Sequence, residues 1–400
     1  MKVLLSAYAC TPGAGSEPGV GFATLVAIAE NHEVWVLTRL KNVEPLKGYF
    51  RSHPFASRVN VVGLDLSPRA VGIKKRLGAA GLQWYYDRWQ LKARGIGAGL
   101  QEQVSFDLVH HVTFASDWSR AGVADLALPF VWGPVGGGVV TPLRLLSAVG
   151  LRGAGEEAAR VAGRALMRRR RWYREAWRNA TVVLVQNRET AALGRDIAKT
   201  RVLPNSTALL TEPPGVTASR TKEILVVGRL LPWKGGRLAL RALEHVTDPQ
   251  AVLVFLGDGP ALAGLRTMAH KRGIASRVRF EGPLPRVAVL ERMARAGALL
   301  HPALHDESPV TIGEALSLGT PVVCLDRGGP PELLRRWADS PGVAVTVGTP
   351  KRTARMLGEE INRFLSDPPA VVATAYRPTP SYSESLLTAY EVAAKADLVD

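Results

Sequence analysis

Two long cationic side chains follow one apolar run in the second half of the chain, in a pattern suited to an anionic ligand. Arg229 comes just after the run at residues 224–227, and Lys234 lies where an Ala-, Leu- and Arg-containing helix is expected to begin. In an open parallel sheet, ligands bind beyond the carboxyl ends of the strands, where helix N-termini also gather. The guanidinium fork and the ammonium charge can then hold a diphosphate. The alternative is a pair of solvated surface cations.

A second polar segment follows the apolar run at residues 298–301. Ser308 and Pro309 favour a helix start, because Ser is a good N-cap and Pro suits the first turn of a helix. The backbone amides of residues 308–311 would then point at a phosphate group.

Three carboxylates belong to this segment, namely Asp306, Glu307 and Glu314. Glu314 would lie about two turns inside the helix and would accept hydrogen bonds from sugar hydroxyls. The structural alternative is that Asp306 or Glu307 only complements the helix dipole and that Glu314 pairs with a nearby arginine.

The first half contributes a glycine cluster at Gly13, Gly15, Gly19 and Gly21. It has neither the Gly-Lys-Ser/Thr ending of a P-loop nor the GxGxxG spacing, so it does not indicate a nucleoside-triphosphate site. We expect these glycines, Gly15 and Gly19 among them, to let backbone amides approach a diphosphate and an acceptor. An ordinary tight turn is the alternative.

Two adjacent histidines, His110 and His111, lie toward the carboxyl end of another strand-like run. Neighbouring residues on a strand face opposite ways, so at most one of them can face a binding cleft. We favour His111 for that role and expect the other to be buried and hydrogen-bonded.

The sequence lacks the usual metal-binding patterns. It contains no Asp-x-Asp triplet, no HExxH and no Cys/His cluster, and its two cysteines, Cys10 and Cys324, belong to separate strand-like runs. We therefore expect no metal, no zinc site and no disulfide framework, and a reducing cytoplasm fits this cysteine usage.

Strand-like runs alternate with helical patterns through both halves, which is typical of parallel, doubly wound α/β sheets. In the first half they cover residues 3–6, 33–37, 59–62, 108–112, 130–132 and 182–185, and in the second half residues 224–227, 252–256, 278–280, 298–301 and 322–325. The first run could be mistaken for a signal peptide, but its short length and the Gly/Pro turn after it favour a buried strand.

These patterns predict two Rossmann-like domains with a connection between them. We expect an N-terminal, acceptor-binding domain at residues 1–205, a Pro-rich linker at 206–220 and a nucleotide-sugar-binding domain at 221–375. Residues 376–400 would form a C-terminal segment whose helix can return to the first domain.

The chain of 400 residues carries a net charge of +16, which favours polyanionic partners. No apolar run approaches the ~18 residues of a membrane-spanning helix. Nucleic acid, anionic lipid and phosphorylated substrates all remain open from charge alone.

Five segments of the second half, in this order, resemble the donor-binding half of the retaining GT-B glycosyltransferases of family 4, also called glycosyltransferase group 1. They are Gly228-Arg229 with Lys234-Gly235, Leu256-Gly257-Asp258-Gly259-Pro260, Val278-Arg279-Phe280-Glu281-Gly282, Asp306 with Glu314-Ala315, and Gly319-Thr320-Pro321-Val322-Val323. Residues 8–21, 107–113 and 130–138 resemble a subgroup of that family, and residues 202–205 match its closing turn. The resemblance thus covers nearly the whole chain and implies a GT-B fold.

The resemblance also implies roles for individual residues. Arg229 and Lys234 would bind the donor diphosphate, and Glu314 would bind the nucleotide ribose. Asp306 would contact the transferred sugar where family members usually carry the first of two glutamates eight positions apart. The remaining contacts would come from the backbone of Ser308, Pro309 and Val310, for the sugar and its phosphate, and from the backbone around Phe280 to Leu284, for the base.

The expected reaction is sugar transfer from a nucleotide-diphosphate sugar, with retention and without a metal cofactor. The cations and helix amides would stabilise the leaving diphosphate. A same-face attack, with a donor phosphate oxygen helping to deprotonate the acceptor, is what the family implies, and no side-chain nucleophile is evident. The acceptor would be a glycan, a lipid-linked molecule or a small molecule.

Two stretches of the first half combine cations with Trp and Tyr. One contains Arg160, Arg164, Arg168 to Arg171, Arg174 and Arg178, and the other runs from Lys74 to Arg94 through Trp84, Tyr85, Tyr86 and Trp89. This composition suits an anionic membrane interface, so we expect a cytoplasmic protein that can lie on the inner face of the cell membrane. The alternative is a solvated basic face over an ordinary core stripe.

Other functions are compatible with the same fold, because fold does not fix function. A non-catalytic GT-B subunit, an epimerase or a phosphorylase would keep the two domains. A nucleic-acid-binding protein would use the charge alone, but no zinc module, RNP-type motif or recognition helix supports it.

Overall fold

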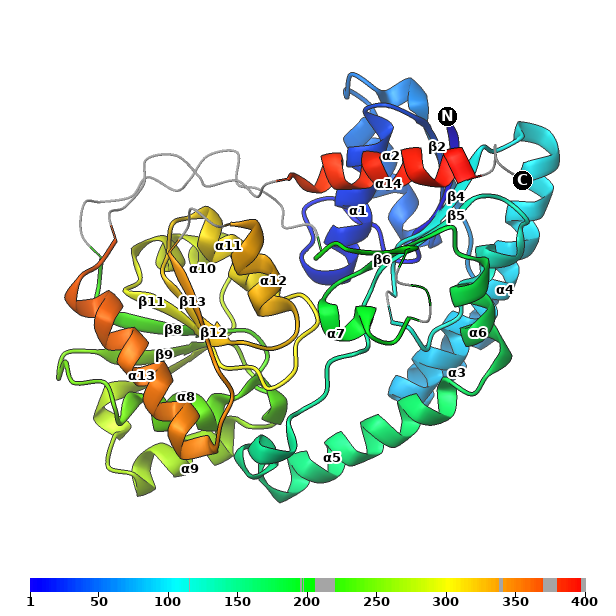
Figure 1. Ribbon diagram of the computed structural model, residues 1–400. Coiled ribbons are helices and arrows are strands. Elements are labelled where there is room, and N and C mark those ends of the chain that lie inside the picture. The colour runs from blue at the N-terminus through cyan, green and yellow to red at the C-terminus, as the bar shows by residue number, and fades with distance from the viewer. Residues whose placement is uncertain are drawn as a thin grey trace. The chain divides into compact units, whose positions relative to one another are not determined.

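The computed structural model describes residues 1–114, 116–194, 196, 198–205, 220–337, 341–369 and 380–396 (Figure 1). It divides into two compact units. The first comprises Met1–Gly138, Gly163–Ser206 and Pro380–Asp400, and the second comprises Val139–Ala162 and Thr207–Thr379. Sequence analysis assigned residues 139–162 to the first domain, whereas here they pack in the second unit. The predicted linker at 206–220 lies outside the described residues except for Arg220.

The described part of the first unit forms a seven-stranded parallel sheet in the order β3-β2-β1-β4-β5-β6-β7. The strands are β1 (Lys2–Ser6), β2 (Glu33–Thr38), β3 (Val59–Gly63), β4 (Leu108–His111), β5 (Phe130–Val135), β6 (Val182–Val185) and β7 (Thr200–Val202). Val3 and Leu5 of β1 belong to the core on one face and Leu4 to the core on the other, as the pleat requires. Because both faces are covered, the strands read as continuous apolar runs.

Helices connect these strands. They are α1 (Ser16–Ala29), α2 (Leu40–Phe50), α3 (Pro68–Arg76), α4 (Gly78–Val104), α6 (Arg171–Asn179) and α7 (Arg188–Ala191), with short 3₁₀ turns η1 (Ala56–Arg58) and η2 (Gly122–Asp125). The late helix α14 (Tyr382–Ala396) lies beside α1 (Figure 1). The Tyr382 hydroxyl is 2.9 Å from Thr24 Oγ1, and Tyr390 is fully buried, so α14 is part of the first unit's core.

The described part of the second unit forms a six-stranded parallel sheet in the order β10-β9-β8-β11-β12-β13. The strands are β8 (Glu223–Val227), β9 (Val252–Leu256), β10 (Val278–Gly282), β11 (Ala298–His301), β12 (Val322–Leu325) and β13 (Gly342–Val345). This order is that of the doubly wound Rossmann fold, as the sequence predicted.

The helices of the second unit cover both faces of its sheet. They are α8 (Gly236–Leu243), α9 (Leu262–Lys271), α10 (Arg286–Arg295), α11 (Val310–Ser317), α12 (Gly329–Arg336) and α13 (Pro350–Ser366), with 3₁₀ turns η3 (Leu143–Leu145), η4 (Pro232–Lys234) and η5 (Ala275–Arg277). Helix α5 (Leu146–Met167) is interrupted at Gly150, whose φ is 76°. Leu145, Ala148 and Val149 are buried in the second unit's main core, which explains why this segment belongs there.

Candidate functional site

The order of strands in the second unit reverses between β8 and β11. β9 and β10 lie on the far side of β8, whereas β12 and β13 lie on the far side of β11. At such a switch point, the loops leaving the two central strands diverge and open a crevice at the carboxyl edge of the sheet. The loops after β8 and β11 carry most of the residues that the sequence singled out.

Lys234 and Asp306 come together at this edge, with His301 beside them. Lys234 Nζ lies 2.5 Å from Asp306 Oδ2, and His301 Nε2 lies 3.1 Å from the same oxygen. Burial alone would raise the pKa of Asp306, but the Lys234 charge and the His301 hydrogen bond outweigh it and hold that pKa well below its usual range. Burial also lowers the pKa of His301, with Asp306 opposing the shift. Asp306 is therefore a carboxylate already paired with a cation.

Backbone contacts hold the two loops against each other. Leu304 N–H donates to the Trp233 carbonyl at 2.8 Å. Gly235 has a φ of 74°, and a Cβ at that position would collide with the Pro302 carbonyl oxygen. Only glycine fits there, because it tolerates the left-handed conformation and the close approach together.

Arg229 projects from the same edge. It is exposed, and its guanidinium makes no hydrogen bond or ion pair with any residue of the described ranges. Arg229 lines one pocket together with Lys234, His301 and Gly228. The structure therefore brings together the two cations that the sequence assigned to a diphosphate. One is paired with Asp306 and the other is available to a ligand.

Glu314 lies on α11, buried, and pairs with Arg286. Arg286 Nε and Nη2 donate to Glu314 Oε1 at 3.0 and 2.8 Å. Glu314 thus pairs with an arginine, as the structural alternative for this residue anticipated. The ribose role of Glu314 stays a prediction.

The start of α11 differs slightly from the expectation. The helix begins at Val310 with Pro309 at its N-cap position, so Ser308 lies one residue before the cap. Pro309 has no N–H and cannot donate to a phosphate. The first amides of α11 are those of Val310 and Thr311, which a helix leaves without intrahelical partners.

Phe280 lies within β10 and Leu284 lies in the loop after it, and the backbone around these two residues was predicted to hold the base. The Phe280 ring stacks on Phe255 with centroids 4.9 Å apart, and Leu284 packs partly buried against the core. The Gly282 carbonyl accepts from Gly257 N–H at 2.7 Å. These side chains are engaged in packing, and contact of the backbone with a base stays a prediction.

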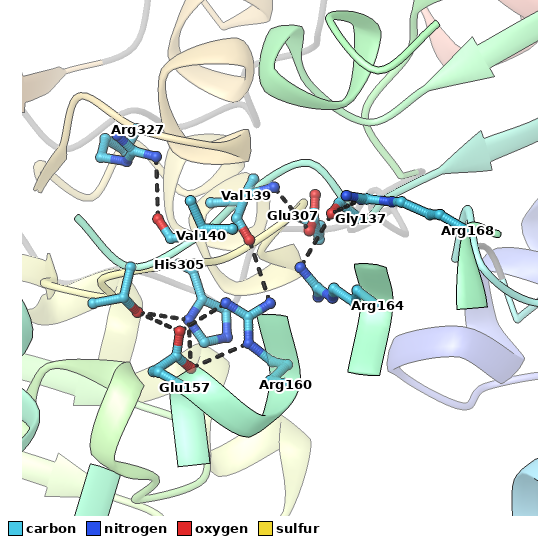
Figure 2. Close-up of polar contacts among 11 residues, drawn as sticks. Gly137, Val139, Val140, Glu157, Arg160, Arg164, Arg168, His305, Glu307 and Arg327 are labelled. Atoms are coloured by element: carbon cyan, nitrogen blue, oxygen red, sulfur yellow. Dashed lines mark hydrogen bonds and ion pairs between the residues drawn. The ribbon is translucent and has the colours of Figure 1, made fainter. Parts of the chain in front are cut away.

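Sequence analysis missed a buried polar network in the same unit (Figure 2). Glu157, on α5, is 3% exposed. Its carboxylate accepts from Thr141 Oγ1 at 2.7 Å and from Arg160 Nη2 at 2.7 Å, and it lies 3.3 Å from His305 Nδ1. Burial opposes ionisation, but His305, Arg160 and Thr141 together hold the pKa of Glu157 below its usual range. In the sequence, Glu157 is a glutamate within an arginine-rich helix, a pattern that is typical of an ion pair on the surface.

Residues 139–141 form a short segment of the second unit, called the strap below. Side chains from elsewhere in this unit form hydrogen bonds with its backbone (Figure 2). Glu307 Oε1 accepts from Val139 N–H at 3.3 Å, and Arg160 Nη1 donates to the Val139 carbonyl at 3.4 Å. Arg327 Nη2 donates to the Val140 carbonyl at 3.1 Å. Glu307 therefore contacts the strap, whereas its neighbour Asp306 faces Lys234.

In the first unit, the two histidines of β4 do face opposite ways, and both are buried. His110 Nδ1 lies 2.8 Å from the Tyr390 hydroxyl, and His111 Nε2 lies 3.0 Å from the Tyr86 hydroxyl. Burial lowers the pKa of His110 to about 4 and that of His111 to about 3. His111 also contacts Ser6 Oγ at 3.2 Å, so both of its ring nitrogens have partners. Its expected role at a cleft stays a prediction.

Gly15 and Gly19 lie at the start of α1, after the carboxyl end of β1. Gly15 is the exposed N-cap residue of this helix, and a Cβ on Gly19 would collide with the Ala14 carbonyl oxygen. Glu17, between them, accepts from Phe114 N–H at 3.0 Å, which ties this turn to the loop after β4. Gly19 is thus required by packing, whereas Gly15 is open to solvent.

The arginine-rich stretch separates into structural and exposed members. Arg168 pairs with Asp117 at 2.7 Å, and Arg164 and Arg168 both donate to the Gly137 carbonyl (Figure 2). The exposed members are Arg169, Arg170, Arg171, Arg174 and Arg178, of which Arg171 pairs with Glu175.

The second basic-aromatic stretch separates in the same way. Tyr85, Tyr86 and Trp89 are fully buried, and Lys74 Nζ lies 3.1 Å from the Tyr8 hydroxyl. Its solvent-facing members include Lys75, Arg76, Trp84 and Arg88.

Metal-binding clusters and membrane-spanning helices are both absent from the described residues. No group of three or more His, Cys, Asp or Glu side chains is arranged to hold a metal ion within the described ranges. Among the same residues, no helix has the length and apolar character to cross a bilayer. Cys10 and Cys324 are buried and not joined to each other, and burial raises the pKa of both thiols.

The second half of the chain matches a known protein family. Residues 213–377 match the family described as glycosyl transferases group 1. This segment contains β8 through α13 and every predicted site residue of the second unit.

Curated relatives match over similar lengths. The chain is 31% identical over 149 residues to 2-deoxystreptamine glucosyltransferase of Streptomyces kanamyceticus, covering 37% of each chain. It is 31% identical over 144 residues to glycogen synthase of Mycobacterium tuberculosis, covering 35% of each. A third relative is the phosphatidylinositol N-acetylglucosaminyltransferase GPI3 subunit of Saccharomyces cerevisiae, 31% identical over 129 residues, or 31% of this chain and 28% of the relative. The chain thus spans well under half the length of these relatives.

Solved structures match over nearly the whole chain. The lipopolysaccharide outer core galactosyltransferase WaaB aligns with a TM-score of 0.58 at 16% identity, covering 98% of this chain and 99% of WaaB. Anabaena HepE in complex with UDP aligns with a TM-score of 0.52 at 16% identity, covering 100% and 99%. At this identity the likeness concerns the fold, and it confirms that the chain has two Rossmann-like units of the GT-B type.

Proposed function

We propose that the protein transfers a sugar from a nucleotide-diphosphate sugar to an acceptor, and that the second unit binds the donor. The observation that carries this proposal is the arrangement of Arg229, Lys234 and Asp306 at the switch point of the second sheet. It lies within the segment that matches glycosyl transferases group 1, and Anabaena HepE, which shares the fold, binds UDP.

The donor diphosphate would lie between Arg229 and Lys234. Arg229 is exposed and can offer its guanidinium fork to a phosphate, while Lys234 exchanges part of its contact with Asp306 for a phosphate oxygen. The amides of Val310 and Thr311 add a helix N-terminus, which favours anions. Asp306, held as a carboxylate, would then accept a hydrogen bond from a hydroxyl of the transferred sugar.

Glu314 would contact the nucleotide ribose from α11. Its pairing with Arg286 orients the carboxylate, and a ribose hydroxyl would share that carboxylate with the arginine. The backbone at residues 280–284 would contact the base, because the Phe280 and Leu284 side chains are engaged in packing.

The proposed chemistry is transfer with retention and without a metal cofactor. Arg229, Lys234 and the α11 amides would stabilise the negative charge that develops on the leaving diphosphate. A donor phosphate oxygen would help to deprotonate the acceptor on the same face of the sugar. This stereochemical course rests on the resemblance of the motifs to the retaining family.

We also propose that the first unit binds an anionic membrane surface through α3 and the start of α4. Ile73, Leu77 and Trp84 are 42%, 55% and 36% exposed, and Lys75 and Arg76 lie exposed between them. No acidic residue occurs from residue 66 to residue 86. Apolar side chains among cations suit the headgroup region of an anionic bilayer, and a lipid-linked acceptor would be reached there.

The donor site is tested by calorimetric titration of the purified protein, with EDTA present, against UDP, GDP, ADP and their glucose conjugates. We expect one nucleotide to bind, and the double variant Arg229→Ala/Lys234→Ala to bind it at least about 100-fold more weakly, because each charge-assisted contact contributes about 1.5–3 kcal/mol. The control Lys271→Ala/Arg272→Ala removes the same charge from the far end of α9 and should bind like the wild type.

Three results would change the proposal. If the wild type binds no nucleotide, the assignment of the donor site is wrong. If the control variant loses as much affinity as the Arg229→Ala/Lys234→Ala variant, the loss reflects the overall charge and not a specific site. Tight binding without sugar transfer to any offered acceptor would favour a non-catalytic subunit.

A further inference from the structure

We propose that Glu157 and His305 are positioning residues that hold Lys234 and Asp306 in place at the carboxyl edge of the second sheet. This inference concerns the donor site of the proposed function and rests on that function. Its geometric basis is a chain of contacts that runs from α5 to the loops after β8 and β11. Figure 2 shows the part of this chain that joins Glu157 to His305.

The first link joins Glu157 to His305. Glu157 Oε1 lies 3.3 Å from His305 Nδ1, and Thr141 Oγ1 lies 3.1 Å from the same nitrogen. Arg160 donates to both carboxylate oxygens, at 3.2 and 2.7 Å. The Glu157 carboxylate is therefore fixed from several directions and can fix the imidazole in turn.

The second link joins His305 to Trp233. The two rings stack with centroids 5.4 Å apart and planes 19° apart. Each ring belongs to the residue just before a member of the ion pair, since Trp233 precedes Lys234 and His305 precedes Asp306. The ring stack and the Lys234–Asp306 contact thus occupy consecutive positions on the same two loops.

The network is not needed to attach α5 to the second unit. Leu145, Ala148 and Val149 already anchor this segment in the apolar core, and a Cβ on Gly153 would press against Pro232. Buried ionic groups are weak sources of net stability, because desolvation offsets their attraction. A buried carboxylate that joins Thr141 and Arg160 to His305 of the β11–α11 loop is better explained by the geometry that it imposes on that loop.

The test compares Glu157→Gln and His305→Phe with the control Glu156→Gln. Glu156 is the neighbouring residue on α5, and it pairs with Arg152 on the surface at 3.1 Å. His305→Phe keeps a ring against Trp233 but removes the Nδ1 contacts. Circular dichroism and thermal unfolding establish that each variant is folded.

The first readout needs no nucleotide. The rate at which acetic anhydride modifies the Lys234 amine is followed by peptide mass spectrometry. We expect Glu157→Gln and His305→Phe to raise this rate severalfold, because Lys234 is held less often against Asp306, and Glu156→Gln to leave it unchanged. An unchanged Lys234 rate in folded Glu157→Gln protein would overturn the inference.

The second readout is the affinity for UDP, GDP or ADP, whichever the wild type binds. We expect Glu157→Gln to weaken binding about tenfold, as small misplacements of binding groups do. In a Lys234→Ala background the same change should have almost no further effect, because Glu157 acts through Lys234 and Asp306. If Glu157→Gln lowers the nucleotide affinity equally in the wild type and in the Lys234→Ala variant, Glu157 does not act through Lys234 and its role is only structural. If the wild type binds no nucleotide, the proposed function fails, while the labelling readout still decides whether Glu157 positions Lys234.

Discussion

Asp306 and Glu307 are adjacent carboxylates with different partners. Asp306 faces Lys234 and His301, whereas Glu307 accepts from the Val139 amide. The sequence placed Asp306 where related enzymes usually carry a glutamate, with Glu307 next to it. The structure shows that Glu307 contacts the strap, whereas the shorter Asp306 contacts Lys234, so the proposed function assigns the donor sugar to Asp306.

Buried His110 of β4 should make the stability of the fold depend on pH. The pKa of His110 is about 4 in the folded protein, below its ordinary value of 6.5, so the unfolded chain takes up a proton first as the pH falls. The stability contributed by the neutral form is complete above about pH 6.5 and is lost toward pH 4, at about 1.4 kcal/mol per pH unit.

His110→Gln should therefore be less stable at pH 7.5, because the Tyr390 and Gly133 contacts are changed, but its stability should fall less steeply between pH 6.5 and 4.5. His270→Gln, at the exposed end of α9, is the control and should keep the wild-type slope. The measurement is urea unfolding at several pH values. Identical slopes for His110→Gln and the wild type would show that His110 is not the group responsible.

Among the secondary-structure elements, the central strands and the edge strands β3 and β10 could be predicted from the sequence, whereas the edge strands β7 and β13 could not. Buried parallel strands read as apolar runs, and residues 252–256, 298–301 and 322–325 were predicted with the observed bounds. β7 (Thr200–Val202) and β13 (Gly342–Val345) were missed, because these two strands have only three and four residues, are mostly not buried and carry little apolar pattern.

Helix α5 shows a different limit of sequence reasoning. Its apolar and basic residues indicate an amphipathic helix but not which core it joins, because that depends on tertiary packing. The same limit applies to Glu157, whose partners Thr141 and His305 are 16 and 148 positions away. By contrast, Arg229, Lys234 and Asp306 could be predicted to meet, because each follows a central parallel strand and such ends share one edge.

Helix α3 carries the membrane proposal, and its surface can be changed without altering the donor site. Ile73→Ser/Leu77→Ser and Lys75→Gln/Arg76→Gln should each weaken sedimentation with vesicles of phosphatidylglycerol and phosphatidylcholine. The charge variant should lose about 30-fold in affinity, since each basic residue contributes about 1 kcal/mol at an anionic surface. Leu40→Ser, at an exposed leucine on α2, is the apolar control. Equal binding of all variants, or equal binding to pure phosphatidylcholine, would refute an anionic membrane site at α3.

At the scale of the whole molecule, the two units have the same type of sheet but different contents at their carboxyl edges. The second unit presents Arg229, Lys234 and the start of α11, which suit a diphosphate. The first unit has the exposed turn before α1 at this edge. Its His111 is buried, and both ring nitrogens of His111 already have hydrogen-bond partners. This asymmetry predicts that a nucleotide binds to the second unit.

The most direct test of that claim is amide hydrogen exchange with and without the nucleotide that calorimetry identifies. We predict slower exchange in peptides covering residues 228–236 and 303–312, with the peptide covering residues 271–277 unchanged as an internal control. Slower exchange confined to peptides of the first unit, such as residues 13–21, would contradict it and would place the nucleotide on the other sheet.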